Sequence, residues 1–215
     1  MMFMSLFTVF SVFFHISDSA INPQRTQLSC AQIKQFVDGH NVRRQQVARG
    51  AVPRQPTASN MKYMVWDDEL AEKAASRAEH GIFGHSQTIV ESQRWSQIGE
   101  NMFINNIPEP SHVPNIEETL DFWFDEHTKY NFEPYGLTLP PGIGHYTQMV
   151  WAESTHVGCG IAQKKEDGWT TTMIICHYGP AGNILGQVPY KSNGAARHLR
   201  CVNRSCDNPY GRYCT

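Results

Sequence analysis

Six cysteines are the feature that most constrains how this chain of 215 residues can fold. Their spacings match no CxxC zinc or redox motif, and their number is even. In a chain exported from the cell, such a set predicts three disulfide bonds and a fold stapled by them. Six cysteines can pair in many ways, so the pairing needs further evidence. All six lie after residue 29: Cys30, Cys159, Cys176, Cys201, Cys206 and Cys214.

The first twenty residues are the most apolar part of the chain. Phe3 to Phe14 form an apolar run that is too short to span a bilayer and fits the core of a secretory signal peptide. Ser17 to Ala20 adds the small residues typical of a cleavage site. We therefore predict a signal peptide at residues 1–20 and a secreted, extracellular protein. No later segment is apolar enough for a transmembrane span.

The remaining chain is long enough for one domain with its own hydrophobic core. We predict this domain over residues 21–190, followed by a short cysteine-containing extension over residues 191–215. The net charge of −2 gives no electrostatic basis for binding nucleic acid. The sequon Asn203-Arg204-Ser205 in the extension predicts N-glycosylation of Asn203, with an unused motif as the alternative.

Three segments show the apolar spacing that is typical of helices. The first, residues 30–49, begins with a capping box at Ser29 and ends before Gly50. A second helix is expected over residues 68–81, and a third, rich in aromatic residues, over residues 116–130. Each of these segments follows a residue that commonly caps a helix.

The clearest pair of strands comes late in the chain. Residues 157–163 and 170–178 are β-prone and are joined by a polar turn that ends in glycine. This hairpin would bring Cys159 near Cys176, which makes them a plausible disulfide pair. Cys30 would then pair with one of the tail cysteines and anchor the tail to the first helix.

Residues 63–66 and 98–104 are also predicted to be short strands. Helices that come before and among strands, with antiparallel pairing at the end, indicate an α+β sandwich. The sequence contains no internal repeat, so this sandwich is expected to be a single unit.

Four segments stand out by their length and order: HNVRR (40–44), GENM (99–102), GHYTQMVWAES (144–154) and IICHYGPAGNI (174–184). Together they resemble the signature motifs of the CAP superfamily of cysteine-rich secretory proteins, antigen 5 and pathogenesis-related proteins. A single domain with a short cysteine tail looks most like the venom-allergen-like proteins of parasitic worms and arthropods. The resemblance implies a three-layer α/β/α sandwich with a small antiparallel sheet, in which HYTQMVW forms a short helix.

The resemblance also implies a central cavity lined by two histidines and two glutamates. Matched motif by motif, these residues are His85, Glu100, Glu126 and His145. Neutral imidazoles can bind a divalent metal while carboxylates orient the rings, and such a set favours zinc or copper over calcium or magnesium. The alternative is a buried polar network in which the four side chains satisfy one another without a ligand.

Catalysis is not the favoured interpretation, because no clear nucleophile accompanies these residues and the family has no generally accepted activity. Cys176 precedes His177, but a disulfide-bonded cysteine cannot attack a substrate. A metal-dependent hydrolase with Glu100 or Glu126 as its base is the alternative function. A channel-blocking toxin is improbable with so few tail cysteines. His40 shares its helical face with apolar residues, which indicates packing.

Members of the family are similar in binding apolar ligands, namely sterols at an aromatic-rich loop and fatty acids in a groove between two helices. Residues 130–146 match the loop in position, and the helices at 30–49 and 116–130 could form the groove. A loop folded onto its own core is the alternative. The candidate lipid-binding side chains are Tyr130, Phe132, Tyr135, Leu137, Leu139 and Ile143.

These expectations combine into one predicted function. The chain is expected to be a secreted venom-allergen-like protein that binds a sterol or fatty acid and a divalent metal. Its expected partner is an extracellular host protein or receptor, with immune modulation as the outcome.

Overall fold

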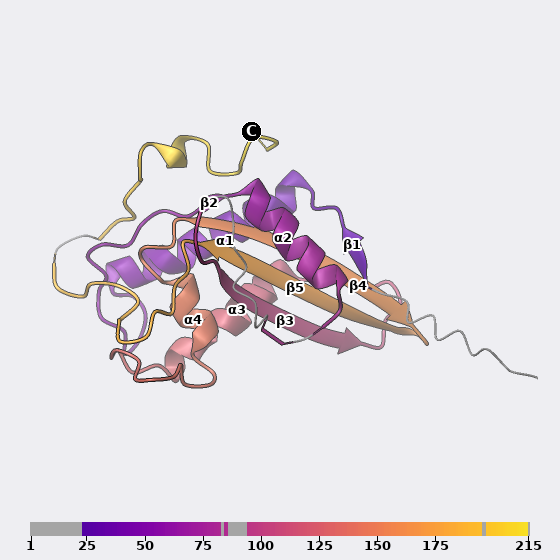
Figure 1. Cartoon of the computed structure of the whole chain (residues 1–215), viewed down its shortest axis with the longest axis horizontal. Helices are drawn as coiled ribbons and strands as arrows, with labels where there is room; N and C mark the ends of the chain where they lie inside the picture. Colours follow the sequence, from indigo (N-terminus) through magenta and orange to yellow (C-terminus); the bar gives the residue numbers. More distant parts are fainter. Residues whose placement is uncertain (1–22, 83, 86–93, 195–196, 215) are drawn as a thin grey trace, which may run out of the picture.

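A five-stranded sheet separates two layers of helices, with α2 on one face and α1, α3 and α4 on the other (Figure 1). This three-layer α/β/α sandwich agrees with the predicted α+β fold. The structure is a computed structural model that describes residues 23–82, 84–85, 94–194 and 197–214. The predicted signal peptide lies outside the described residues.

The helices and strands follow one another in the order β1, α1, β2, α2, β3, α3, α4, β4 and β5, with short 3-10 turns after α3 and in the tail. The helices are α1 (Cys30–Arg49), α2 (Asp68–Glu79), α3 (Ile116–Phe124) and α4 (Gly144–Met149), with 3-10 turns η1 (Asp125–Thr128) and η2 (Ser205–Asp207). The strands are β1 (Gln24–Thr26), β2 (Val65–Trp66), β3 (Gly99–Ile107), β4 (His156–Glu166) and β5 (Trp169–Gly179).

Strands β4 and β5 form the predicted hairpin at the centre of the sheet, whose order is β1-β4-β5-β3 with β2 parallel to β4. Cys159 lies directly opposite Cys176 in this hairpin and is bonded to it, as predicted. The strands are longer than predicted, because the polar residues expected in the turn continue the ladder. Only Asp167 and Gly168 turn the chain, with φ values of 51° and 83°, which suits a two-residue hairpin turn.

Helix α1 has the predicted limits, since Ser29 caps its first turn and Gly50 ends it with a φ of 71°. Helix α3 is shorter than predicted. After Phe124 the chain tightens into η1, where the Lys129 N–H donates to the Glu126 carbonyl. This tighter turn directs the Glu126 side chain toward the start of α4.

Helix α2 packs closely on β4 because small residues line their contact. A Cβ added at Gly160 would lie 2.3 Å from the Ala75 Cα, so only glycine permits this approach. A small hydrophobic cluster, separate from the main core on the other face, lies between α2 and the sheet. Its members are Ala74, Ala78, Met102, Ala162, Met173 and Ile175.

Arg44 joins α1 to the segment that follows α4. Its side chain is fully buried, and its guanidinium donates to the backbone carbonyls of Lys62, Met149, Trp151, Ala152 and Ser154. Burial lowers the pKa of Arg44 to about 9, so the group stays charged at neutral pH. The HYTQM part of the HYTQMVW segment forms helix α4, in agreement with the short helix that the family resemblance implied, and the helix ends at Met149 with Val150 as its cap.

The tail returns to the start of α1, where Cys214 is bonded to Cys30. The other tail cysteines, Cys201 and Cys206, are bonded to each other. Further contacts hold the tail, including an ion pair between Arg212 and Asp68 at 3.0 Å. No helix in the described part of the chain is long and apolar enough to cross a membrane.

Candidate functional site

A cavity of about 610 Å³ lies between β3, α4 and the loops that flank α4 and follow β5. The four residues predicted from the family motifs all line it: His85, Glu100, Glu126 and His145. A fifth ionisable residue, His177 of β5, lines it as well. The structure therefore brings together residues that are far apart in the sequence.

Glu126 and His145 form one side of the cavity. The Nδ1 atom of His145 lies 2.9 Å from Glu126 Oε1. The other carboxylate oxygen, Oε2, accepts from the backbone N–H groups of His145 and Tyr146 at 2.8 and 3.2 Å. Burial would raise the pKa of Glu126, but these hydrogen bonds lower it, so the side chain is ionised at neutral pH.

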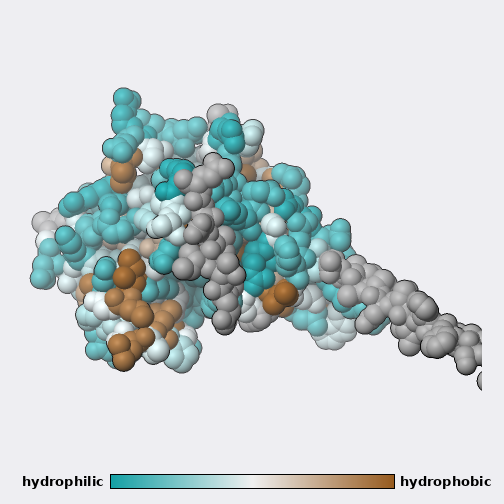
Figure 2. Space-filling view, in the orientation of Figure 1, coloured by the Kyte–Doolittle hydropathy of each residue, from teal (hydrophilic) through white to brown (hydrophobic). Residues whose placement is uncertain are grey.

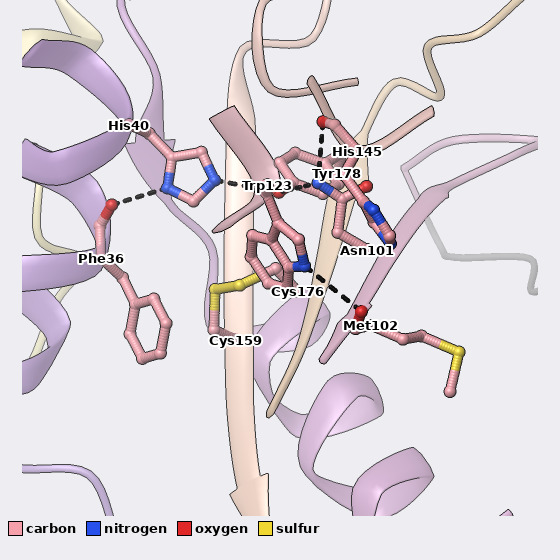
Figure 3. The surroundings of a disulfide bond; sticks show 9 residues. All are labelled: Phe36, His40, Asn101, Met102, Trp123, His145, Cys159, Cys176 and Tyr178. Atoms are coloured by element: carbon pink, nitrogen blue, oxygen red, sulfur yellow. Dashed lines mark hydrogen bonds between the residues drawn. A yellow bond between two sulfur atoms is a disulfide. The ribbon is translucent and has the colours of Figure 1, made fainter. Parts of the chain in front are cut away.

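The carboxylate of Glu126 fixes the tautomer of His145. An ionised carboxylate only accepts hydrogen bonds, so Nδ1 carries the proton and Nε2 keeps its lone pair when the ring is neutral. The ring also stacks on Trp123, with centroids 6.0 Å apart and planes inclined by 21°. Trp123 is fixed in turn by a hydrogen bond from its Nε1 to the Met102 carbonyl at 3.2 Å (Figure 3).

Glu100 forms the other side of the cavity and is the cross-strand neighbour of His177. Its Oε1 lies 3.0 Å from His85 Nδ1, and its Oε2 lies 3.2 Å from His177 Nε2. The Arg77 Nε lies 3.8 Å from the same Oε2. Burial opposes ionisation of Glu100, but the hydrogen bonds from His177 and His85 outweigh it and lower the pKa to about 2.

His177 is a site residue that the sequence analysis missed, since it was considered only as the neighbour of Cys176. Successive side chains of a strand point to opposite faces, so a buried Cys176 on one face places His177 on the other. That alternation was the available signal. The His177 side chain is only 1% exposed, and its buried Nδ1 has no hydrogen-bond partner among the described residues.

The predicted tetrad is arranged as two separate pairs, His145 with Glu126 and His85 with Glu100. Among the described residues, no group of three or more His, Cys, Asp or Glu side chains could hold a metal ion. Each carboxylate instead holds one imidazole ring through its Nδ1 atom. Carboxylates commonly orient metal-binding histidines in this way. Nε2 of His85 and Nε2 of His145, for which the described residues supply no hydrogen-bond partner, are the atoms that could bind a metal.

His40 has the structural role predicted for it. Its Nδ1 donates to the Phe36 carbonyl at 2.7 Å, so its Nε2 accepts from the Tyr178 hydroxyl at 2.9 Å. Asn101 then donates both to this hydroxyl and to the backbone carbonyl of His145, each at 3.1 Å (Figure 3). A continuous hydrogen-bond chain therefore joins α1 to the cavity.

Half of the predicted lipid-binding side chains belong to the core. Tyr130, Tyr135 and Ile143 are buried, so they do not form an exposed surface, contrary to the prediction. The alternative of a loop folded onto its own core describes them, because the tyrosine hydroxyls find partners in the protein. Phe132 is partly buried and packs on Tyr190, with ring centroids 4.7 Å apart.

The other two candidates, Leu137 and Leu139, are 95% and 37% exposed. They belong to a group of exposed aliphatic residues that we call the apolar lip: Leu137, Leu139, Ile184 and Leu185. A hydrogen bond from Gly186 N–H to the Tyr135 carbonyl ties the two segments of the lip together. Figure 2 shows hydrophobic residues gathered where Figure 1 places the loop before α4.

The groove between α1 and α3, expected to suit a fatty acid, is small and charged. Its volume is about 220 Å³. Arg43 reaches across it to Glu117 at 3.1 Å and Asp121 at 2.6 Å. These ion pairs make the wall of the groove charged, which disfavours an acyl chain there.

Comparison with known proteins identifies similar sequences and folds. A family model described as the cysteine-rich secretory protein family, CAP, matches residues 37–178. Scoloptoxin SSD552 of Scolopendra dehaani is 39% identical over 165 residues, which cover 74% of this chain and 73% of that protein. Venom allergen 5.02 of Dolichovespula maculata is 36% identical over 166 residues, which cover 73% of this chain and 75% of that protein.

Solved structures agree with these matches. A crystal structure of NaASP2 with Zn²⁺ has a TM-score of 0.62 and 30% sequence identity, and the match covers 77% of this chain and 87% of that one. The structure of BmVAL-1 has a TM-score of 0.65 and 29% identity, with 78% and 85% of the two chains covered.

Proposed function

This chain belongs to the cysteine-rich secretory protein (CAP) family, and on that premise we propose that it is a secreted venom-allergen-like protein that binds a divalent metal and an apolar ligand. The observation that carries the proposal is the pairing of each cavity histidine with a buried carboxylate. The 2.9 Å contact between His145 Nδ1 and Glu126 is the best defined of these pairs.

The metal would be bound by the Nε2 atoms of His85 and His145. Both rings use Nδ1 toward a carboxylate, which leaves Nε2 as the available lone pair. Nitrogen ligands favour zinc or copper over calcium and magnesium. The relative NaASP2, whose crystal structure is described as containing Zn²⁺, supports this choice. A bound metal would supply Lewis acidity and a fixed positive charge to the cavity.

The apolar ligand would bind at the apolar lip rather than in the groove between α1 and α3. Exposed aliphatic residues that lie together on a soluble protein commonly mark a binding surface. The lip adjoins the cavity, since Leu139 belongs to both. The ion pairs of Arg43 argue against a fatty acid in the groove, so a sterol at the lip is the better candidate.

A role outside the cell is supported by the three disulfides and by the relatives named as venom proteins. We infer that the partner is an extracellular host protein and that the response it changes is immune. Asn203 is exposed in the loop closed by Cys201 and Cys206, which suits a glycan.

Hydrolysis is the less favoured alternative. A general base needs a free oxygen near the attacking water. Both oxygens of Glu126 accept hydrogen bonds from α4, and both oxygens of Glu100 face histidines. Both carboxylates are therefore already engaged in holding histidines, which favours binding over base catalysis.

Native mass spectrometry of the secreted protein tests the metal. We expect the wild type to retain or take up one zinc or copper ion, and we expect His145→Ala to lose it. His198→Ala, which removes an exposed tail histidine, is the matched control and should keep the metal. A wild type that takes up neither added ion would leave the histidines and glutamates as a structural network.

A sterol-binding assay tests the apolar ligand separately. We expect the double variant Leu137→Ser/Leu139→Ser to lose sterol binding, because it removes the two exposed apolar side chains of the predicted loop. Val113→Ser is the control, since Val113 is 75% exposed and lies outside the lip. Equal binding by all three proteins would contradict a site at the lip.

A further inference from the structure

The walls of the cavity offer hydrogen-bond acceptors but few free donors. Four amide side chains line it: those of Gln97, Asn101, Gln148 and Asn183. The NH₂ groups of Asn101, Gln148 and Asn183 donate to other parts of the protein, namely the His145 and Gly144 carbonyls and the Tyr178 and Ser154 hydroxyls, whereas Gln97 is exposed. When their rings are neutral, His85 and His145 each keep a lone pair on Nε2, because Nδ1 of each ring lies against a carboxylate oxygen.

The charge of the cavity is negative. Glu100 and Glu126 place two carboxylates on its wall, and their oxygens face histidine nitrogens and the first backbone N–H groups of α4. Arg77 approaches Glu100 at 3.8 Å but is not among the residues that line the cavity. The described lining includes no lysine or arginine. A cation is therefore favoured over an anion.

His177 adds an independent indication of a ligand. Its Nε2 faces the ionised Glu100 and so carries the proton, which leaves Nδ1 as an acceptor. This atom is buried without a partner among the described residues, and the side chain is 1% exposed. Buried polar atoms usually have a partner, so a ligand with an N–H or O–H donor would satisfy it.

The rim of the cavity is apolar. Leu139, Pro140 and Pro141 line its opening, and the rest of the apolar lip lies beside them. A hydrated metal ion makes no use of such a rim. A ligand with an apolar body would cover it while its polar end lies in the cavity.

We propose that the cavity and the apolar lip together bind an amphipathic organic cation, a primary ammonium group carried on an alkyl chain. The three N–H donors of the ammonium match the acceptor-rich, negatively charged cavity, and the chain covers the lip. The inference rests on the proposed ligand-binding role of this site and names a class of ligand for it. A metal ion and the ammonium would compete, because they need the same lone pairs.

Isothermal titration of the full-length secreted protein with three probes of equal chain length tests this inference. We expect octylammonium to bind at least about tenfold more tightly than octanol, and octanoate to show no binding. A higher salt concentration should weaken the binding of octylammonium but not that of octanol, because only the ammonium group is attracted by charge. Saturating zinc should block octylammonium.

Two variants test whether Glu100 provides the charge that attracts the ammonium group. Glu100→Gln should reduce octylammonium affinity to that of octanol, whereas Glu117→Gln, an equal loss of charge near α1, should not. Equal affinity of the wild type for octylammonium and octanol, without salt dependence, would contradict the preference for a cation and leave only an apolar binding site. Zinc uptake with no binding of any octyl probe would overturn the inference and retain the metal site.

Discussion

Arg44 is a buried cation whose hydrogen bonds all go to backbone carbonyls. We predict that Arg44→Met destabilises the protein by at least about 3 kcal/mol, because several buried carbonyls lose their donor at once. The free energy of unfolding in urea measures this. Arg49→Met on the exposed side of the same helix should change it by less than about 0.5 kcal/mol. A loss for Arg44→Met as small as that for Arg49→Met would show that water replaces the guanidinium.

His40 makes the fold sensitive to acid. Burial lowers its pKa from 6.5 to about 3, so the native state binds fewer protons than the unfolded state within this range, and stability falls as the pH decreases below 6.5. Between pH 7 and pH 5 we predict that His40→Gln loses about 2 kcal/mol less stability than the wild type. Urea unfolding at the two pH values measures the difference, and parallel losses would contradict it.

At the scale of elements, Glu126 links the start of α4 to the orientation of His145. In Glu126→Gln one oxygen becomes an NH₂ group. If this group faces α4 it cannot accept from the backbone N–H groups, and if it faces His145 it donates to Nδ1 and reverses the tautomer. We predict a loss of about 1 kcal/mol in stability and a zinc affinity lower by about 10- to 100-fold. Glu118→Gln, an exposed change in α3, is the control. Unchanged zinc affinity in a competition titration would show that Glu126 does not orient the ligand.

Helix limits could be predicted where a cap lies within the helix's own sequence. Ser29, Asp67 and Asn115 each accept from a backbone N–H in the first turn, as their local patterns indicated. The end of α3 was missed because the turn into η1 goes with a contact between Glu126 and α4, which is distant in sequence. Local sequence contains no trace of that partner.

The candidate site was likewise predicted only in part from the sequence. The four family residues came from motifs, and the structure places all of them on one cavity. The contact between Glu100 and His177 depends on the register that sets them opposite each other in the sheet. Strand register is a long-range property, so spacing along the chain could not supply it. The burial of Tyr135 was misjudged because its hydroxyl bonds to Asn183, which is distant in sequence.

At the scale of the whole molecule, the bond between Cys30 and Cys214 joins residues separated by 184 positions, whereas Cys201 and Cys206 are 5 apart. A longer closed loop removes more entropy from the unfolded chain. We predict that Cys30→Ser/Cys214→Ser costs about 2–4 kcal/mol and that Cys201→Ser/Cys206→Ser costs clearly less. Thermal unfolding of the two double variants measures the difference, and equal losses would contradict the entropic explanation.

The same bond makes most of the described chain a closed covalent ring. A protease that cuts one peptide bond between residues 30 and 214 opens this ring but releases no fragment, because both pieces stay attached through the sulfur bridge. The nicked molecule would migrate as one species on a non-reducing gel and as two after reduction. The two pieces remain on one molecule and can therefore reassociate. A first cut thus still allows the cavity and the apolar lip to re-form.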